Sequence, residues 1–264
     1  MKILYVGDVM GEVGVEIVEK VLPGLCGEKQ IDLVIAQAEN VSDGKGITVE
    51  DFKRLRKAGV DFCTGGNWSL HQPEIIPALS DPAQPIIRPA NYPAGTPGLG
   101  WKYTKTHAGK VLVISLLGQI VGKDADKPVD NPLAAIDQIL ESQKDIDRAA
   151  TIVNFHGDYS SEKVIIGHYL DGRVTAVIGD HWHVPTADAR VLPGGTAHIT
   201  DVGMCGALNA SLGVKLETVI PRWRDGKKTP NVLETAGLRQ FNAMLITTNK
   251  DGSAVEVEQI QRVF

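Results

Sequence analysis

The chain has 264 residues, of which 43% are hydrophobic and 22% are charged, as in ordinary folded globular proteins. Its 27 Lys and Arg residues and 32 Asp and Glu residues give a net charge of -5, so we expect neither disorder nor a stable complex with nucleic acid. A small phosphate ester remains a suitable partner if positive charge is supplied locally. We expect a single domain over residues 1–264, because α/β folds of this length commonly form one core.

The apolar segments are all too short to cross a membrane. The first, over residues 3–6, ends at Gly7 and is also too short for a secretion signal. Cys26, Cys63 and Cys205 are widely spaced and contain no C-x-x-C pair, which indicates reduced thiols. We therefore expect a cytoplasmic protein without a membrane partner.

The first elements predict a βαβ unit. Apolar runs at residues 3–6 and 33–36 are typical of strands buried on both faces of a sheet. Between them, an apolar stripe over residues 13–22 predicts a helix that Pro23-Gly24 ends.

The rest of the chain continues this alternation of strands and helices. A capping-box-like start at Thr48, with Asp51 three residues later, predicts a helix that runs to Ala58. A Pro- and Gly-rich loop over residues 89–100 is long enough to frame a functional site. The other expected elements are strands at 60–64, 111–117, 151–155 and 174–178, helices at 132–142 and 162–170, a turn at 171–172, and a terminal hairpin of 244–248 with 254–263.

Side chains that bind metals recur where the apolar runs end. In an open α/β sheet, residues at strand ends converge on the rim where ligands bind. Each residue taken alone has a structural explanation, such as a helix cap or a turn. A shared function explains the whole array better, because the structural explanations would have to coincide at the ends of several strands. The array consists of Asp8, Glu39, Asn40, Asn67, His156, His181 and His183.

The triplet His181-Trp182-His183 is the sharpest part of this array. If the segment is extended, residues two apart point to the same side and both imidazoles reach one centre. Carboxylate, amide and imidazole ligands without thiolate favour Mn, Fe or Zn and suit a pair of divalent ions. Such a pair activates water for hydrolysis, and phosphoester cleavage fits that chemistry.

Other catalytic motifs are weak or missing. The segment 7–14 follows a strand but is not G-x-G-x-x-G, and the segment 43–48 lacks P-loop spacing. The chain has no G-x-S-x-G elbow and no cysteine in a nucleophile motif, so covalent catalysis is not expected.

A series of motifs follows in order along the chain: Gly7-Asp8-Val9, Glu39-Asn40, Gly44-Lys45-Gly46-Ile47-Thr48, Arg88-Pro89-Ala90-Asn91-Tyr92-Pro93, Leu170-Asp171-Gly172-Arg173-Val174, Leu192-Pro193-Gly194-Gly195-Thr196-Ala197 and Ile199-Thr200-Asp201-Val202-Gly203-Met204. With these motifs the chain closely resembles the YmdB-like bacterial calcineurin-type metallophosphoesterases. The resemblance implies an α/β fold, specifically a four-layer αββα sandwich, and a two-metal phosphodiesterase acting on small nucleotides such as 2',3'-cyclic AMP.

The resemblance also assigns roles to the array. It implies that Asp8 and His183 hold one divalent ion, and that Glu39 bridges to a second. The second ion is then held by Asn67, His156 and His181, while Asn40 contacts the phosphate. Fe or Mn is the expected metal, with Zn as an alternative.

The main departure from the family lies directly after Asn67, and smaller ones lie at Trp182 and at His156-Gly157-Asp158. Where the family has a catalytic histidine after the asparagine, this chain has Trp68, whose indole donates a hydrogen bond but does not transfer a proton near neutral pH. If that histidine is the general acid, its loss costs about 10²- to 10⁴-fold. His71 offers a replacement if the loop makes one helical turn. Trp68 and Trp182 are candidates to stack a base, although packing roles explain them equally well.

Three carboxylates are candidates to orient the ligands: Asp158, Asp188 and Asp201. The sequence thus predicts a phosphodiesterase whose activity Trp68 reduces or alters. The alternative is a metal- and nucleotide-binding regulatory protein with little hydrolytic activity. We also expect a homo-oligomer.

Overall fold

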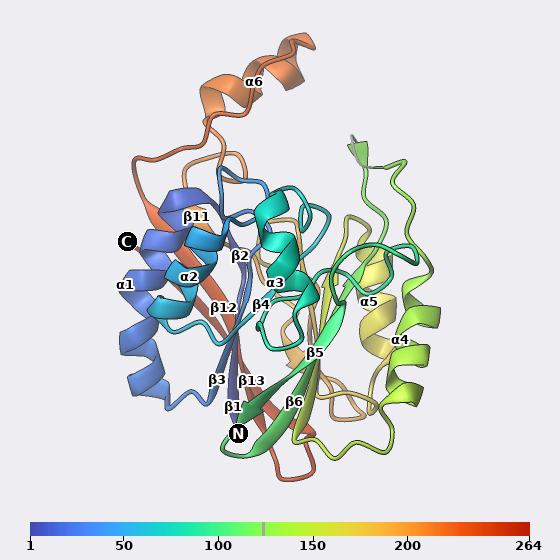
Figure 1. Ribbon diagram of the computed structural model, residues 1–264. Coiled ribbons are helices and arrows are strands. Elements are labelled where there is room, and N and C mark those ends of the chain that lie inside the picture. The colour runs from blue at the N-terminus through green and yellow to red at the C-terminus, as the bar shows by residue number, and fades with distance from the viewer. Residues whose placement is uncertain (123–124) are drawn as a thin grey trace.

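Two β-sheets pack face to face, and helices cover their outer faces (Figure 1). The computed structural model describes residues 1–122 and 125–264. The first sheet has the strand order β2-β11-β12-β1-β3-β4, with β13 paired to β12. Its strands are β1 (Lys2–Val6), β2 (Asp8–Val9), β3 (Leu33–Gln37), β4 (Phe62–Thr64), β11 (Met204–Ala207), β12 (Arg239–Thr248) and β13 (Ala254–Val263).

The second sheet has the order β5-β6-β7-β8-β10-β9. In it, β6, β7, β8 and β10 run parallel, whereas the edge strands β5 and β9 are antiparallel to their neighbours. Its strands are β5 (Trp101–Thr106), β6 (Gly109–Leu117), β7 (Ala150–His156), β8 (Ala176–Asp180), β9 (Arg190–Val191) and β10 (Ala197–Ile199).

Alternating side chains divide the interior into three apolar layers. On β1, Ile3 and Tyr5 face the layer between the sheets, whereas Leu4 and Val6 face the helices outside. This is the period of two that a strand buried on both faces requires. The result is a four-layer αββα sandwich, as the sequence predicted.

The helices α1 (Gly11–Lys29) and α2 (Val49–Ala58) pack on the first sheet, and α4 (Pro132–Ser142) and α5 (Ser160–Tyr169) pack on the second. A short 3₁₀ turn, η1 (Pro73–Ile75), leads into α3 (Ile76–Ser80). The Thr48 side chain accepts a hydrogen bond from the Asp51 backbone N–H, which confirms the predicted cap of α2. The β12–β13 hairpin is also confirmed.

The predicted end of the first helix at Pro23-Gly24 is wrong, because α1 continues to Lys29. Pro23 lies on the exposed side of the helix, while Leu22 and Leu25 on either side of it are fully buried. Burial of apolar side chains beyond the proline therefore offsets the lost backbone hydrogen bond.

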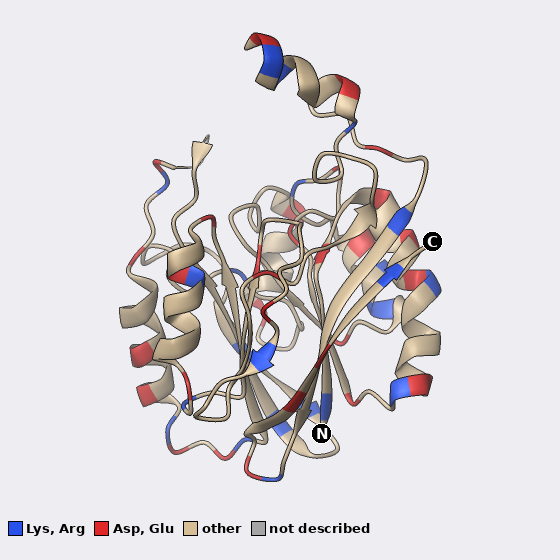
Figure 2. Cartoon of the chain, turned by 180° about the vertical axis from the view of Figure 1, so that it is seen from behind, with Lys and Arg blue, Asp and Glu red and all other residues tan. Residues whose placement is uncertain are grey.

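The helix α6 (Leu216–Asp225) projects from the sandwich and has no buried residue (Figures 1 and 2). The sequence did not predict it, nor the short strands β2, β9, β10 and β11, which lack a clear apolar run. Among the described residues, no helix is both long and apolar enough to cross a membrane.

Candidate metal centre

The predicted site residues meet at one edge of the sandwich, where strands of both sheets end. Asp8 begins β2, Glu39 follows β3, and Asn67 follows β4. His156 is the last residue of β7, and the segment 181–183 directly follows β8. The two sheets therefore contribute comparable shares of the cluster, which is buried except for the partly exposed His181.

One half of the cluster centres on the His156 imidazole. Its Nε2 atom lies 2.8 Å from Glu39 Oε1 and 3.1 Å from Asn67 Oδ1. The ring of His181 lies close by, with 4.4 Å between the ring centroids. Glu39, His156 and His181 each bring a potential ligand atom within 4.8 Å of the others.

The other half centres on the Asp8 carboxylate. Its Oδ2 atom accepts the backbone N–H of His181 at 3.2 Å, and its Oδ1 atom lies 3.9 Å from His183 Nε2. The same His183 nitrogen lies 3.3 Å from Asn40 Oδ1. Asp8 thus connects the two halves, because it contacts the His183 imidazole and the backbone N–H of His181.

The segment that carries His181 and His183 is not extended, so that prediction is wrong. Both residues adopt left-handed backbone conformations, with φ of 101° and 63°. Such values are unfavourable for residues other than glycine and persist where the surroundings fix them. The two imidazoles reach the cluster because the chain bends sharply after Asp180, and not because a strand alternates.

The cluster has the donors and the charge that a cation requires. Among the described residues, Asp8 Oδ1 and Glu39 Oε1 are buried carboxylate oxygens without a hydrogen bond, although Glu39 Oε1 lies at ion-pair distance, 2.8 Å, from His156 Nε2. Leaving a buried carboxylate oxygen unpaired is costly unless a cation compensates it. Oxygen and imidazole nitrogen ligands without thiolate suit Mn, Fe or Zn. The donor set therefore fits divalent metal.

The pKa shifts of Asp8 and His156 reflect the same excess of buried negative charge, whereas that of His183 reflects burial. Burial and the nearby Asp180 carboxylate raise the pKa of Asp8 well above its usual value. Burial alone favours a neutral His156 ring, but the carboxylates of Glu39 and Asp180 outweigh it and raise the pKa. Burial, together with the neighbouring His181, lowers the pKa of His183 to about 4. The His183 ring is therefore neutral at neutral pH, as a metal ligand must be.

Asp180 orients His156 from the side opposite the cluster. Its Oδ1 atom lies 2.7 Å from His156 Nδ1, and its Oδ2 atom accepts from Tyr5 at 2.9 Å, Asn154 at 2.5 Å and Gln37 at 3.2 Å. Asp8, His156 and Asp180 also lie close enough to form a second possible ligand group. We assign Asp180 an orienting role, because both its oxygens are already occupied by hydrogen bonds.

Close approach of the backbone at Gly66 makes the cluster compact. A Cβ atom at this position would lie 2.4 Å from both Glu39 Oε2 and His156 Cδ2. Two residues later, the Trp68 backbone N–H donates to Glu39 Oε2 at 2.9 Å. Gly66 and Trp68 therefore hold the Glu39 carboxylate against the imidazole.

The Trp68 ring is covered by charged side chains. Lys45 Nζ lies 4.9 Å and Lys127 Nζ 5.3 Å from its ring, which are cation–π distances. His71 packs edge-on against the ring at 5.2 Å, and its backbone N–H donates to Trp68 O, so the predicted helical turn is present. His71 is exposed, however, whereas the cluster is buried.

Trp182 is also held by neighbours. Its Nε1–H donates to Asp158 O at 3.0 Å, and Lys163 Nζ lies 4.0 Å from its ring. Lys163 is fully buried and pairs with Asp201 at 2.7 Å. This network fixes the bend between the two histidines.

Two of the predicted supporting carboxylates lie beside the cluster. Asp158 Oδ1 is 3.3 Å from His181 Nε2, and Asp201 accepts the backbone N–H of Trp182 at 2.9 Å. Asp188 instead accepts hydrogen bonds from Thr186 and Thr200, so it supports the loop and not a ligand.

Sequence reasoning missed Asp180, Asn154, Gln37 and Lys163. Two signals were available: Asp180 ends an apolar strand immediately before His181, and Asn154 interrupts the apolar run of another strand. A polar residue inside a buried strand needs a partner, and here the partner is Asp180.

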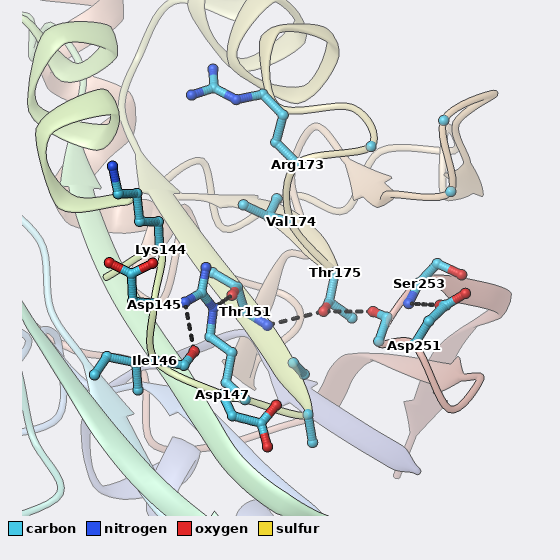
Figure 3. Close-up of a pocket in the computed structure, with 17 residues that line it drawn as sticks. Lys144, Asp145, Ile146, Asp147, Thr151, Arg173, Val174, Thr175, Asp251 and Ser253 are labelled. Carbon is cyan, nitrogen blue, oxygen red and sulfur yellow. Dashed lines mark hydrogen bonds between the residues drawn. The ribbon is translucent and has the colours of Figure 1, made fainter. Parts of the chain in front are cut away.

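A large cavity, of about 730 Å³, lies away from this chemistry (Figure 3). It is formed by segments 144–151, 172–175, 194–195 and 251–253, beyond the opposite ends of β7 and β8. Its arginines are engaged: Arg148 donates to Thr151 and Gln143, and Arg173 pairs with Asp137. We assign it no part in the site.

The cysteines do not contribute to the cluster. All three are free thiols. Burial raises the pKa of Cys63 and of Cys205 to about 12, so both stay protonated and unreactive at neutral pH.

Comparison with known proteins identifies the family. A family model described as YmdB-like protein matches residues 4–260. The chain belongs to the YmdB-like family. The 2',3'-cyclic-nucleotide 2'-phosphodiesterase of Bacillus subtilis (strain 168) is 36% identical over 262 residues, which is 98% of this chain and 96% of that protein.

Two solved structures of similar proteins extend over the whole chain. A protein described as a novel phosphatase of Mycoplasma pneumoniae is 29% identical, with a TM-score of 0.92 over 100% of this chain and 93% of its own. A hypothetical protein from Thermus thermophilus is 35% identical, with a TM-score of 0.90 over 100% of this chain and 99% of its own. The predicted YmdB-like resemblance and metallophosphoesterase fold are thus confirmed.

Proposed function

We propose that this chain is a metal-dependent phosphodiesterase that hydrolyses small nucleotides such as 2',3'-cyclic AMP. The observation that carries the proposal is the buried cluster in which Asp8 Oδ1 and Glu39 Oε1 face imidazoles without hydrogen bonds of their own. The phosphodiesterase activity in the name of the Bacillus subtilis relative supports the class of substrate.

In this proposal the cluster holds two divalent ions, Fe or Mn, with Zn as the alternative. Asp8 and His183 would hold one ion, and Glu39 would bridge to the second. The second ion would be held by His156 and by the two residues that contact it, Asn67 and His181. Bound as a pair, such ions lower the pKa of water to about 7 and stabilise charge on phosphate oxygens.

The protein's own groups would orient the reactants. Asp180 holds His156 Nδ1, so that Nε2 faces the cluster. Asn40 Nδ2 donates one hydrogen to Gly44 O at 3.0 Å, and its second hydrogen can serve a phosphoryl oxygen. The Trp68 backbone N–H keeps Glu39 in place.

A second candidate function is a regulatory protein that binds metal and nucleotide but hydrolyses slowly. The observation that favours it is Trp68, because its indole does not protonate a leaving alkoxide near neutral pH. His71 is the proposed replacement acid, although its exposure beside Trp68 argues for a minor role.

Metal analysis combined with two substrates tests both candidates. An activated aryl phosphodiester needs little protonation of its leaving group, whereas 2',3'-cyclic AMP needs much. We expect bound transition metal and cleavage of both substrates, and we expect His156→Ala to abolish metal binding and both activities. The control is His107→Ala, whose imidazole is 73% exposed on the β5–β6 turn. Protein that cleaves only the aryl ester supports the regulatory candidate, and protein without metal refutes both.

We further propose a cytoplasmic homo-oligomer. The free cysteines agree with a reducing compartment. On α6, Leu216, Ile220 and Trp223 are 43%, 51% and 88% exposed and lie on one helical face, which a second copy can cover by twofold packing. Sedimentation velocity should show that the wild-type protein is an oligomer and that Trp223→Ser shifts it toward monomer. A wild-type protein that sediments as a monomer would refute this.

A further inference from the structure

A second cavity, of about 250 Å³, opens directly beside the metal centre. The segment 117–122 after β6 forms one wall, together with Lys127 and Val129, and the side chains of Tyr92 and Tyr159 line it as well. Asn67 also lines it, so the cavity shares a residue with the cluster.

Asn67 determines what the cavity can receive. Its Oδ1 atom lies 3.1 Å from His156 Nε2, so the cavity begins within one side chain of the buried imidazole. A phosphoester bound at the cluster therefore has one of its organic substituents next to this opening. The cavity is therefore continuous with the cluster through Asn67.

The cavity lining includes aromatic and apolar side chains, which suit a planar ligand group. Tyr159 and Val121 are 46% and 52% exposed, which leaves aromatic and apolar surface open to a ligand. Drug-sized ligands need cavities of about 300 Å³ or more, so this one fits a smaller planar group such as a nucleobase. Aromatic side chains bind bases by stacking, which accepts every base.

The tryptophans are less suited to this role than Tyr159. Trp68 has Lys45 and Lys127 at cation–π distance from its ring, and Trp182 has Lys163 at 4.0 Å. Neither tryptophan is among the described residues that line the cavity. The lysines over Trp68 add positive charge near the opening, which favours an anionic ester.

We propose that the cavity bounded by Tyr92, Val121 and Tyr159 binds the nucleobase of the substrate, with the phosphate at the cluster. This rests on the proposed phosphodiesterase function. In this proposal, stacking of the base on Tyr159 makes the protein prefer nucleotides over other diesters. Tyr159 thus takes the base-stacking role for which Trp68 and Trp182 were candidates.

The test compares two ribose 2',3'-cyclic phosphates that differ in the group at C1': 2',3'-cyclic AMP, which carries adenine, and the cyclic phosphate of methyl riboside, which carries a methoxy group instead. Tyr159→Ala should lower kcat/KM for the nucleotide about tenfold or more and leave the base-free ester unchanged. The matched control is Tyr169→Ala, at the other end of α5, where the tyrosine is 39% exposed and bonded to Asp137. Equal losses on both substrates, or no loss, would overturn the proposal.

A binding measurement separates this proposal from the proposed function. Adenosine has no phosphate, so its binding to metal-free protein, followed by calorimetry, reports the cavity alone. We expect wild-type protein and Tyr169→Ala to bind adenosine, and Tyr159→Ala to bind it at least tenfold more weakly. If wild-type protein cleaves neither ester but binds adenosine through Tyr159, the proposed function fails and the cavity assignment stands. If adenosine does not bind, the cavity assignment fails.

Discussion

Replacing Asp180 by Asn should switch the tautomer of His156. Asp180 Oδ2 accepts from three donors, on Tyr5, Asn154 and Gln37, while Oδ1 faces His156 Nδ1 at 2.7 Å. An asparagine satisfies the three donors only if its carbonyl takes the Oδ2 position. Its NH₂ group then points at His156 Nδ1, which must become an acceptor.

The proton of His156 moves to Nε2 as a result. That nitrogen lies 2.8 Å from Glu39 Oε1 and is the atom that faces the cluster. A protonated Nε2 cannot bind metal. Metal binding requires the proton of His156 to return to Nδ1, where it faces the NH₂ group of the new asparagine. Two donors that face each other in a buried site cost about 1–3 kcal/mol of free energy, so metal affinity should fall about 10- to 100-fold.

Chelator-competition titrations of wild-type and Asp180→Asn protein measure this difference directly, and kcat/KM on an aryl phosphodiester should fall in parallel. Asp188→Asn is the matched control, because its carboxylate accepts hydrogen bonds from Thr186 and Thr200 and faces no ligand. A folded Asp180→Asn protein with unchanged metal affinity would show that Asp180 does not orient His156.

Three further predictions follow from other contacts. Trp68→His should raise the cleavage of 2',3'-cyclic AMP by up to about 10²- to 10⁴-fold and change the aryl diester rate little; equal rates before and after would refute the missing-acid argument. Gly66→Ala should cost about 1–3 kcal/mol in denaturant unfolding and weaken metal binding, because its Cβ would lie 2.4 Å from Glu39 Oε2. Gly24→Ala is the control: it lies inside α1 with nothing within 4 Å of the added Cβ, so it should not destabilise the protein and should gain up to about 1 kcal/mol. Burial lowers the pKa of His198 in the folded protein. As pH falls below about 6.5, the unfolded chain therefore takes up the extra proton first, and the free energy of unfolding drops. Urea titrations at pH 7.5 and 5.5 should show a smaller drop for His198→Gln than for wild type, and equal drops would contradict this.

The site residues at strand ends were predictable because a residue that directly follows a buried apolar run lies at the rim of the sheet. Asp8, Glu39 and Asn67 follow apolar runs that form β1, β3 and β4, and a strand end delivers the next residue to the rim. The course of the backbone between His181 and His183 was not predictable. It depends on contacts to segments distant in sequence, such as the Asp8 carboxylate that accepts the His181 N–H.

Helix ends were predicted where a local cause decides them, as at Thr48. They were missed where packing decides, as at Pro23, because burial of Leu25 outweighs a local signal. The hydrogen bonds around Asp180 were missed for a similar reason, since they join four separate strands or strand ends that no single window of sequence contains.

The position of β12 between β11 and β1 has a consequence for the order in which the site matures during synthesis. Asp8 is made first, but its backbone N–H donates to Gly203 O and its strand pairs with β11, so it has no fixed place until residue 204 has been added. The first sheet then stays split until β12 enters it next to β1. A ribosome-bound chain can therefore carry every histidine of the cluster and still lack the aspartate in position, so we expect the proposed metal centre to form only after the last quarter of the polypeptide has emerged.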